Sequence, residues 1–329
     1  MISIITPSFN QANFLEQTIL SVLEQDYPDV EYLIADGAST DGSVDIIRRY
    51  ASSPLSNSSP LNTGLDWWCS EVDAGQADAI NKGFSRAKGD IIAWLNSDDI
   101  YLPETLSKVA KLFAKNPTAG IIYGDVLSID GDGNPINVQQ FAPYKLNDLM
   151  AFNIISQPAV FMRRSVLEQA GYLDINYHFL LDHHLWLRMA QLAPMIYTPQ
   201  ILAKARYHED AKNIAHAERF GTEAFKILDW METQPLMVNI LRDEKEEILA
   251  GAHHLDAFYL VEAGKMKAGL KAYWRTFRYN PKTALKSWKR ILYAFLSLLG
   301  FSSIKESYLK SRQKSLTRMD ANVFRNLRH

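Results

Sequence analysis

The segment GDIIAWLNSDD, at residues 89–99, constrains the fold more than any other part of the chain. The apolar run at residues 91–95 has the composition of a buried central strand. Asp98 and Asp99 follow this run at its carboxyl end, which is where open α/β sheets bind their ligands. Adjacent carboxylates repel each other unless a cation lies beside them, so the segment predicts a site for Mg2+ or Mn2+. The alternative is a polar turn that leads into a helix beginning at Pro103.

Apolar runs and helical periodicity alternate along the first two thirds of the chain. The predicted strands cover residues 2–6, 31–35, 65–70, 90–95, 120–129, 155–164 and 195–207, the last as two short strands. The predicted helices cover residues 12–25, 77–86, 103–115 and 165–170, with two more ending at residue 50 and beginning near residue 182. This order predicts an α/β fold with a mostly parallel central sheet flanked by helices.

Polar side chains stand at the ends of four of the predicted strands. They are Thr6, Asp36, Glu71 and Asp98. Because the carboxyl ends of parallel strands meet at one edge of a sheet, we expect these side chains to line one cleft.

Composition places the chain among ordinary globular proteins, with 47% apolar and 22% charged residues in 329. Its single cysteine, Cys69, excludes an intrachain disulfide framework and predicts a cytoplasmic protein in which Cys69 packs in the core. We expect no secretory signal, since a strand with no preceding basic residue opens the chain, and no run approaches the ~20 apolar residues of a membrane span. No nucleic acid partner is expected.

The C-terminal region differs from the rest of the chain in pattern and in charge. We predict one domain over residues 1–215 and a helical region over 216–329. Residues 265–329 contain 16 Lys and Arg against two acidic residues, a net charge of +14, whereas the remainder carries −16. The last helical segment, from Pro281, mixes basic residues with Trp288 and Phe295, which predicts peripheral contact with anionic lipid at the inner face of the plasma membrane. The alternatives are docking on the chain's own surface or on a second copy as a homodimer.

Five motifs together make the sequence resemble the inverting family 2 glycosyltransferases, which adopt the nucleotide-diphospho-sugar transferase (GT-A) fold. They are TPSFNQ at residues 6–11, DGASTDGS at 36–43, EVDAGQADAINKGF at 71–84, GDIIAWLNSDD at 89–99 and LDHHLWLR at 181–188. The resemblance covers about residues 2–212, roughly two thirds of the chain.

The resemblance implies a nucleotide and donor site with a divalent metal. Asp98 and Asp99 resemble the family's metal-binding pair, but Asn96 stands where an Asp is usual, which leaves open which carboxylate is the direct ligand. His208, in a late basic segment with Arg206 and Lys212, is a further candidate ligand. The implied nucleotide- and donor-binding residues are Thr6, Pro7, Phe9, Asp36 (to the base), Asp41, Asp73, Gly75, Gln76, Asp78, Lys82, Asn96, Ser97 and Asp98.

Asp182 resembles the family's catalytic base, the group that takes the proton of the acceptor hydroxyl. An Asp at a helix start is also commonly an N-cap, so that alternative stays open. The family often has an acidic residue two positions later, where this chain has His184. We favour the interpretation that His184 is a neutral surface replacement over a role for it at the acceptor site. Trp186 and Arg188 are predicted to support the base structurally. The two histidines at positions 253 and 254 are predicted to lie on a helix surface.

Glycosyl transfer from a nucleoside diphosphate expels a leaving group that gathers negative charge, which a divalent cation offsets. The resemblance implies a hexosyltransferase that acts with inversion on a hydroxyl of a glycan or polyprenyl-linked acceptor, in cell-surface polysaccharide, O-antigen or glycolipid synthesis. UDP is the expected carrier, with GDP and dTDP as alternatives. A catalytically silent nucleotide-sugar-binding or scaffold module is the alternative function. Nucleotidyl transfer is disfavoured, because residues 6–11 contain neither Gly nor Lys.

Overall fold

The computed structural model describes residues 1–52, 64–208 and 216–300, and the chain divides into two compact units. The first unit comprises Met1–Ser128, Val138–Leu149 and Ile154–Arg206, and the second comprises Ile129–Asn137, Met150–Asn153 and the chain from Tyr207 onward. The predicted division after residue 215 adjoins residues 209–215, which lie outside the described part of the chain, and it stays a prediction.

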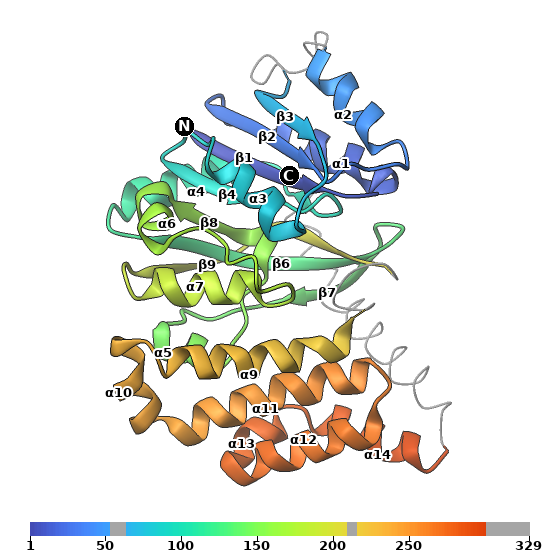
Figure 1. Ribbon diagram of the computed structural model, residues 1–329, viewed down its shortest axis with the longest axis vertical. Helices are drawn as coiled ribbons and strands as arrows, with labels where there is room; N and C mark the ends of the chain where they lie inside the picture. The colour runs from blue at the N-terminus through green and yellow to red at the C-terminus, as the bar shows by residue number, and fades with distance from the viewer. Residues whose placement is uncertain (53–63, 209–215, 301–329) are drawn as a thin grey trace. The chain divides into compact units, whose positions relative to one another are not determined.

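Within the described residues, a nine-stranded sheet runs in the order β3-β2-β1-β4-β8-β6-β9-β5, with β7 paired to β6 (Figure 1). The strands are β1 Ile2–Ser8, β2 Val30–Asp36, β3 Trp67–Ser70, β4 Ile91–Trp94, β5 Ile100–Tyr101, β6 Ile121–Asp130, β7 Pro135–Gln139, β8 Val160–Arg163 and β9 Met195–Tyr207. The short strand β5 was not predicted, and the region 195–207 forms one strand rather than two, with Pro199 accommodated at an exposed position.

The sheet has a parallel half and an antiparallel half. Strands β3, β2, β1 and β4 pair in parallel, and Ser8, Asp36 and Ser70 lie level with one another across the first three. Strand β8 runs antiparallel to both β4 and β6, and β5 runs antiparallel to β9. The predicted α/β class is confirmed. The pairing is mixed because β8 lies between β4 and β6 and runs antiparallel to both.

The helices of the first unit lie close to their predicted positions. They are α1 Ala12–Leu23, α2 Ser43–Ser52, α3 Gln76–Phe84, α4 Thr105–Lys115, α5 Leu146–Met150, α6 Arg164–Ala170 and α7 Leu181–Ala190. Helix α5 was not predicted. The strand predicted for residues 155–164 begins instead with a 3-10 turn, Gln157–Ala159, which leads into β8.

The core of the first unit lies around the central strands. The strand residues Ile5, Ile92 and Trp94 are almost entirely excluded from solvent. The ring of Phe84, from α3, meets the Trp94 ring edge-on at 5.7 Å between centroids. Trp186, from α7, stacks on Trp94 at 5.3 Å. The stack packs α7 against β4, whose carboxyl end leads to the two adjacent carboxylates.

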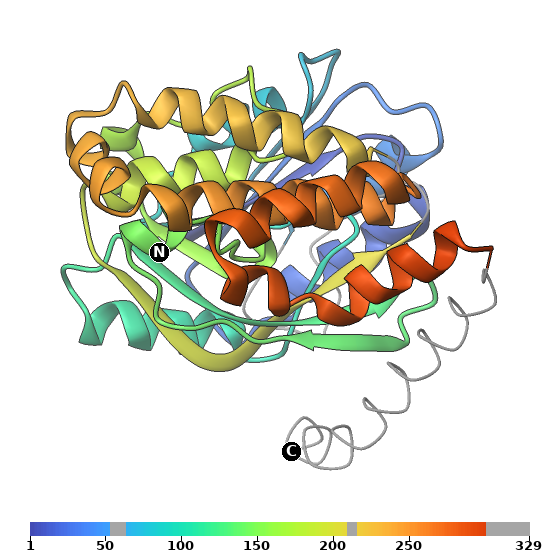
Figure 2. The ribbon, with the colours of Figure 1, turned by 90° about the horizontal axis from the view of Figure 1, so that it is seen from below.

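From residue 216 to residue 300 the second unit is helical, whereas its segment Ile129–Asn137 contains the end of β6 and the start of β7. It contains a 3-10 turn, Ala217–Arg219, and the helices α9 Phe220–Met231, α10 Pro235–Asp243, α11 Lys245–Glu262, α12 Met266–Tyr279, α13 Pro281–Leu285 and α14 Trp288–Leu298. Helices α11 and α12 lie side by side (Figure 2). They are joined through Gly264, whose φ of +76° favours glycine. A Cβ at Gly269 would lie 2.5 Å from the Val261 side chain, so a glycine lets the two helices approach closely.

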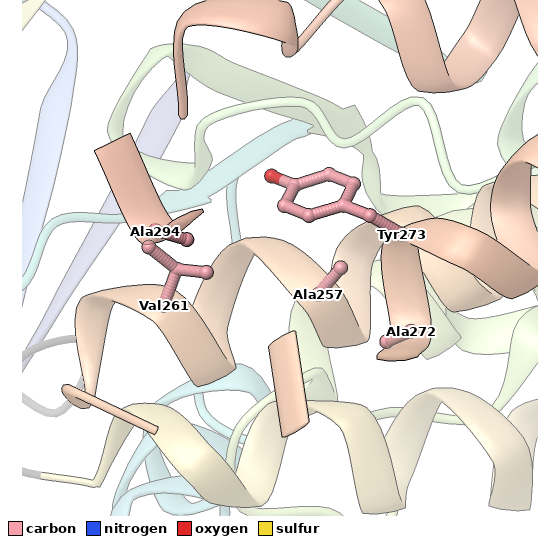
Figure 3. Packing of buried hydrophobic residues seen from close by; sticks show 5 residues of the cluster. All are labelled: Ala257, Val261, Ala272, Tyr273 and Ala294. Carbon is pink, nitrogen blue, oxygen red and sulfur yellow. The ribbon is translucent and has the colours of Figure 1, made fainter. Parts of the chain in front are cut away.

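A small apolar cluster holds α11, α12 and α14 together (Figure 3). It consists of Ala257, Val261, Ala272, Tyr273 and Ala294. Four of these five side chains are small or β-branched, which allows close helix packing around the single aromatic ring.

The prediction that the histidines at 253–254 lie on a helix surface is wrong. His253 is buried, and its ring stacks parallel to the Tyr279 ring. His254 is hydrogen-bonded through Nε2 to the Ser287 hydroxyl at 2.8 Å, and burial lowers the pKa of His254 to about 4. A helix pattern alone places polar residues toward solvent, whereas here Phe225 of α9 and Tyr279 of α12 pack on His253, and Ser287 contacts His254.

Candidate active site

The candidate site is the donor edge, by which we mean the carboxyl ends of β1 to β4 and the loops that follow them. Asp36, at the end of β2, is only 1% exposed. Ser39 donates to its carboxylate from the backbone N–H (2.9 Å) and from the hydroxyl (2.5 Å), and the Ser70 hydroxyl donates at 2.7 Å. Asp36 therefore joins its own loop to the end of β3. Its predicted bond to a nucleotide base stays a prediction.

Asp41 organises the helix starts beside this loop. Its carboxylate accepts hydrogen bonds from the Ser43 N–H (3.0 Å), the Ser43 hydroxyl (2.6 Å) and the Ala12 N–H (2.9 Å). Partial burial raises the pKa of Asp41, but the bonds from Ser43 and Ala12 outweigh it and hold the pKa below its usual value. Asp41 is thus an ionised acceptor that ties the start of α1 to the start of α2.

The residues predicted to line the nucleotide pocket differ in exposure. Thr6 and Pro7 lie inside β1 and are buried, and the Thr6 hydroxyl is 3.0 Å from the Tyr32 hydroxyl. Phe9, just beyond β1, is 62% exposed. A Cβ at Gly37 would lie 2.8 Å from an Asp73 carboxylate oxygen and 3.3 Å from the Phe9 ring, so these two side chains meet over a glycine. The exposed ring and the carboxylate face the same small loop.

The start of α3 supplies several predicted donor-binding residues. Gly75 has a φ of +109°, which favours glycine, and its N–H donates to Asp73 Oδ1 at 2.8 Å. Lys82 pairs with Glu71 at 3.0 Å and with Asp78 at 3.7 Å. Burial lowers the pKa of Lys82, but the bond to Glu71 and the charge of Asp78 raise it above the usual value, so it stays a cation. The ion pairs connect the β3 end to α3.

Three side-chain amides form a connected chain across the donor edge. Gln76 Nε2 donates to Asn96 Oδ1 at 2.8 Å. Asn96 Nδ2 donates to both Asp99 Oδ2 and Gln157 Oε1, each at 3.1 Å. Gln157 Nε2 donates to the Trp94 carbonyl at 2.7 Å. We call Gln76, Asn96 and Gln157 the amide chain. Its third member was not among the predicted site residues, and its only signal was a polar residue before proline at the start of an apolar run.

Asp98 and Asp99 have different surroundings although they are adjacent. Asp99 is 4% exposed, and the Arg206 N–H donates to its Oδ1 at 3.0 Å while Asn96 donates to its Oδ2. Burial, and after it the charge of Asp98, raise the pKa of Asp99 well above its usual value. Asp98 is partly exposed. Both Asp99 carboxylate oxygens therefore already accept protein hydrogen bonds, Oδ1 from β9 and Oδ2 from Asn96.

Arg206 holds this segment from β9. It is buried, its Nε donates to the Asp98 carbonyl at 3.0 Å, and its Nη2 donates to Gln17 Oε1 at 2.7 Å. The guanidinium lies 4.8 Å from the centre of the Phe14 ring. The described contacts of Arg206 fix the loop after β4. Lys212, predicted in the same basic segment, lies outside the described residues.

Asp182 lies in the first turn of α7 and is partly buried. The residue before the helix is Leu180, so Asp182 is not the N-cap, and its Oδ1 accepts the His183 N–H at 2.7 Å. Arg188 supports the helix by donating to the carbonyls of Ala170, Gly171 and Tyr172 at the end of α6. The stack of Trp186 on Trp94 couples the first turns of α7 to β4.

The prediction that His184 is a surface replacement is wrong. His184 is 3% exposed, and its ring stacks on Tyr177 at 4.1 Å between centroids. The adjacent His183 is also buried. Its Nε2 lies 3.0 Å from the Leu149 carbonyl, and burial lowers the pKa of His183 to about 4. Both imidazoles are packing elements of α7, which the order of residues could not indicate.

His208 follows β9 and belongs to the second unit, so its proposed part in the metal site stays a prediction. In the described part of the chain, no three or more His, Cys, Asp or Glu side chains are grouped so that they could hold a metal ion by themselves.

Residues 3–171 match the family described as Glycosyl transferase family 2. This match covers just over half of the chain, and the chain belongs to that family. The predicted family is therefore confirmed, and with it, at the level of the family, the prediction of a glycosyltransferase.

Among similar proteins is the putative teichuronic acid biosynthesis glycosyltransferase TuaG of Bacillus subtilis, 31% identical over 192 residues, which are 57% of this chain and 71% of that protein. The uncharacterized glycosyltransferase alr2836 of Nostoc sp. is 29% identical over 53% of this chain, and the matched region spans about half of that relative (54%). A PGL/p-HBAD biosynthesis glycosyltransferase of Mycobacterium bovis is 27% identical over 64% of this chain and 77% of its own length.

Two solved structures share the fold at lower identity. The mannosyltransferase PcManGT of Pyrobaculum calidifontis, in complex with GDP-Man and Mn2+, has a TM-score of 0.57 and 21% identity over 95% of this chain and 85% of its own. S. aureus TarS 1-349 in complex with UDP-GlcNAc has a TM-score of 0.55 and 14% identity over 88% of this chain and 91% of its own. The predicted GT-A fold is confirmed.

Proposed function

We propose that this chain transfers a sugar from a nucleoside-diphosphate sugar to a hydroxyl of a glycan or lipid-linked acceptor, with inversion at the transferred carbon. The observation that carries this proposal is the donor edge of a family 2 chain, where the amide chain and the Asp98–Asp99 pair converge at the carboxyl end of β4. Open α/β sheets bind ligands at this edge.

A divalent cation fits the residues at this edge if the phosphates of the donor supply some of the ligands of that cation. Mg2+ and Mn2+ bind through one or two carboxylates plus substrate phosphates and water, so a protein cluster of three ligands is not required. Asp99 already accepts two hydrogen bonds, whereas Asp98 is partly exposed, so we assign the direct ligand to Asp98 and a supporting role to Asp99. When bound, the ion would offset the charge of the diphosphate leaving group.

Asp182 acts as the base. Its carboxylate takes the proton from the acceptor hydroxyl as that oxygen forms a bond to the anomeric carbon, and the bond from that carbon to the diphosphate oxygen breaks on the opposite face. Asp182 stands on a helix braced by the Trp186–Trp94 stack and by Arg188. Rigid support of this kind keeps a catalytic group within reach of its substrate.

UDP is the carrier we propose first, and the acceptor belongs to cell-surface polysaccharide or glycolipid synthesis. The complex of TarS with UDP-GlcNAc supports UDP, and the complex of PcManGT with GDP-Man keeps GDP as an alternative. The names of the Bacillus and Mycobacterium relatives support the acceptor class, since they refer to teichuronic acid and PGL biosynthesis.

The test is calorimetric titration of UDP, GDP and dTDP, each with Mn2+ and with EDTA. We expect one nucleotide to bind only with Mn2+, and Asp98→Ala to abolish that binding. Asp132→Ala is the matched control, because Asp132 is an exposed carboxylate in the β6–β7 turn. Nucleotide binding that does not depend on the metal, or no nucleotide binding at all, would contradict the proposal. Metal-dependent binding without turnover on any acceptor would favour the silent nucleotide-sugar module instead.

We further propose that one face of the second unit contacts anionic lipid, the acceptor's own membrane. Residues 263–300 contain nine Lys and Arg and no Asp or Glu. Trp288, Leu292 and Phe295 in α14 and Leu299 directly after it recur at helical spacing and are exposed, while Ala294 on another face is buried in the cluster of Figure 3. Exposed aromatic and aliphatic residues among basic ones suit the interface of an anionic bilayer.

This contact is peripheral. No helix in the described stretches 1–52, 64–208 and 216–300 has both the length and the hydropathy of a membrane span. We place the docking face on α14 together with Trp274 and Phe277 of α12, two exposed rings stacked at 5.9 Å. The rest of the predicted tail, residues 301–329, lies outside the described residues.

Sedimentation with liposomes tests the docking face. We expect binding to vesicles rich in anionic lipid, little binding to zwitterionic vesicles, and loss of binding in the double variant Leu292→Ser/Phe295→Ser. Leu236→Ser is the matched control, because Leu236 in α10 is equally exposed and lies outside the basic segment. Unchanged sedimentation of the double variant would refute this face. A dimer in light scattering that the double variant abolishes would assign the face to a second copy.

A further inference from the structure

We propose that Gln157 is a positioning residue for the donor site, acting through Asn96 on Gln76 and Asp99. This inference rests on the proposed function, because it concerns the same donor edge. Gln157 opens the 3-10 turn before β8, 61 residues after Asn96, and it is 7% exposed. It would touch no reacting atom. Its effect is to determine how the amide chain is oriented.

The orientation begins at a backbone group that cannot be reversed. The Trp94 carbonyl only accepts, so the Gln157 side chain must turn its NH2 toward it, at 2.7 Å. That leaves Gln157 Oε1 as an acceptor facing Asn96, which must present its own NH2, at 3.1 Å. The same Asn96 NH2 donates to Asp99. One carbonyl of the central strand therefore sets the direction of two amides in succession.

The last step reaches the donor loop. With its NH2 directed at Gln157 and Asp99, Asn96 turns Oδ1 toward Gln76, whose Nε2 donates to it at 2.8 Å. Gln76 is the first residue of α3. A free amide can flip and exchange donor for acceptor, but here a flip would put two donors or two acceptors in contact. Gln157 thereby fixes the orientation of these amides before the donor binds, so that binding does not lose free energy in ordering them.

This arrangement also explains why residue 96 is Asn rather than the more usual Asp. An ionised carboxylate at position 96 would face Gln157 Oε1 and Asp99 Oδ2 without a hydrogen to donate to either. Only an amide can donate to both. The departure of Asn96 from the common motif thus follows from the presence of Gln157 and from the burial of Asp99.

The first test replaces Gln157 with Met, which has a similar length and no amide. We expect the affinity for the nucleotide diphosphate with Mn2+, and the KM for the donor sugar, to weaken by about tenfold, with a smaller change in kcat and none in the acceptor KM. Gln25→Met is the matched control. Gln25 is 3% exposed, donates to the carbonyls of Ser21 and Leu102, and accepts from the Leu106 N–H. Gln25→Met should lower the melting temperature of the protein and leave its affinity for the donor unchanged.

A double-mutant cycle separates positioning from general stability. If Gln157 acts through Asn96, then Gln157→Met weakens nucleotide binding in the wild-type background and has no further effect in an Asn96→Ala background. Equal losses in both backgrounds would overturn the proposal. So would wild-type affinity in Gln157→Met.

Asn96→Asp supplies an independent measurement that does not depend on how Gln157→Met folds. We expect the Asp variant to bind the nucleotide diphosphate more weakly than wild type, and affinity equal to or above wild type would overturn the proposal. If the wild-type chain itself bound no nucleotide in the presence of Mn2+, the proposed function would fail first. The two failures are therefore distinguishable.

Discussion

The two halves of the sheet contribute to the donor edge in different ways. In the parallel half, β3-β2-β1-β4, the predicted site residues lie on or just beyond the strand ends, as Asp36 and Asp73 do. In the antiparallel half, the contributing residues come from distant parts of the chain. Gln157 reaches Asn96 across 61 positions, and the Arg206 N–H reaches Asp99 across 107. The parallel half carries the groups expected to meet the donor, and the antiparallel half determines how those groups are held.

This difference also separates the two adjacent carboxylates. Asp98 and Asp99 belong to one motif and come from the same strand end. Asp99 faces β9 and accepts from Arg206, whereas Asp98 stays partly exposed. A motif can therefore specify that two carboxylates are present while a distant strand decides which one is buried.

The largest effect should come from the one proposed catalytic group, Asp182, which lies on α7 and outside both halves of the sheet. Asp182→Asn keeps the size of the side chain but removes the base, so we expect transfer to fall by about 10²–10⁴-fold while donor binding persists. Asp174→Asn is the control, because this carboxylate lies in the loop before α7 and accepts from the Asn176 N–H at 2.9 Å. Initial rates measure transfer and calorimetry measures donor binding in both variants. Normal activity in Asp182→Asn would contradict the assignment of Asp182 as the base.

A smaller effect should follow from removing the support given by β9. Arg206→Met deletes the buried donors to the Asp98 carbonyl and to Gln17, so we expect a loss of about 1–3 kcal/mol in the free energy of unfolding, together with weaker nucleotide affinity. Urea denaturation and calorimetry measure the two effects.

The control for this prediction is Arg163→Met. Arg163 also donates to a backbone carbonyl, that of Ala119, and its guanidinium lies over the Phe113 ring at 5.1 Å. Its backbone pairs with Ile91 in β4, but the described contacts of its side chain do not include Asp98 or Asp99. Stability should fall in this variant and nucleotide affinity should not. If both Arg variants affect affinity equally, β9 has no special role in holding the donor edge.

The smallest effect concerns the pH dependence of stability. Burial lowers the pKa of His183 from 6.5 to about 4, so the folded state favours the neutral imidazole. Its contribution to stability is fully present above the unfolded-state pKa and is lost as pH falls from 6.5 toward 4. His183→Gln keeps a donor for the Leu149 carbonyl and should flatten this dependence.

Urea midpoints at about pH 7 and about pH 5 measure the effect, because the linkage acts between the two pKa values. An unchanged difference between the two midpoints in His183→Gln would show that His183 does not titrate on unfolding.

Much of this molecule was predictable because short segments determine it. The apolar run at residues 91–95 contains β4, the two carboxylates follow it, and the motifs at 6–11, 36–43 and 71–84 begin at or next to the carboxyl ends of β1, β2 and β3. Local periodicity also located most helices. Such features depend on neighbours within a few residues, and the chain carries that information directly.

Only the tertiary structure decided the rest. It inserted β8 between β4 and β6, buried His184 and His253 where polar residues were expected to face solvent, and buried Asp99 against the Arg206 N–H while Asp98 stayed partly exposed. The sequence by itself determined which residue types stand at each strand end. Packing against segments far away in the chain determined which of them are buried and which remain accessible, because burial depends on the partner as much as on the residue.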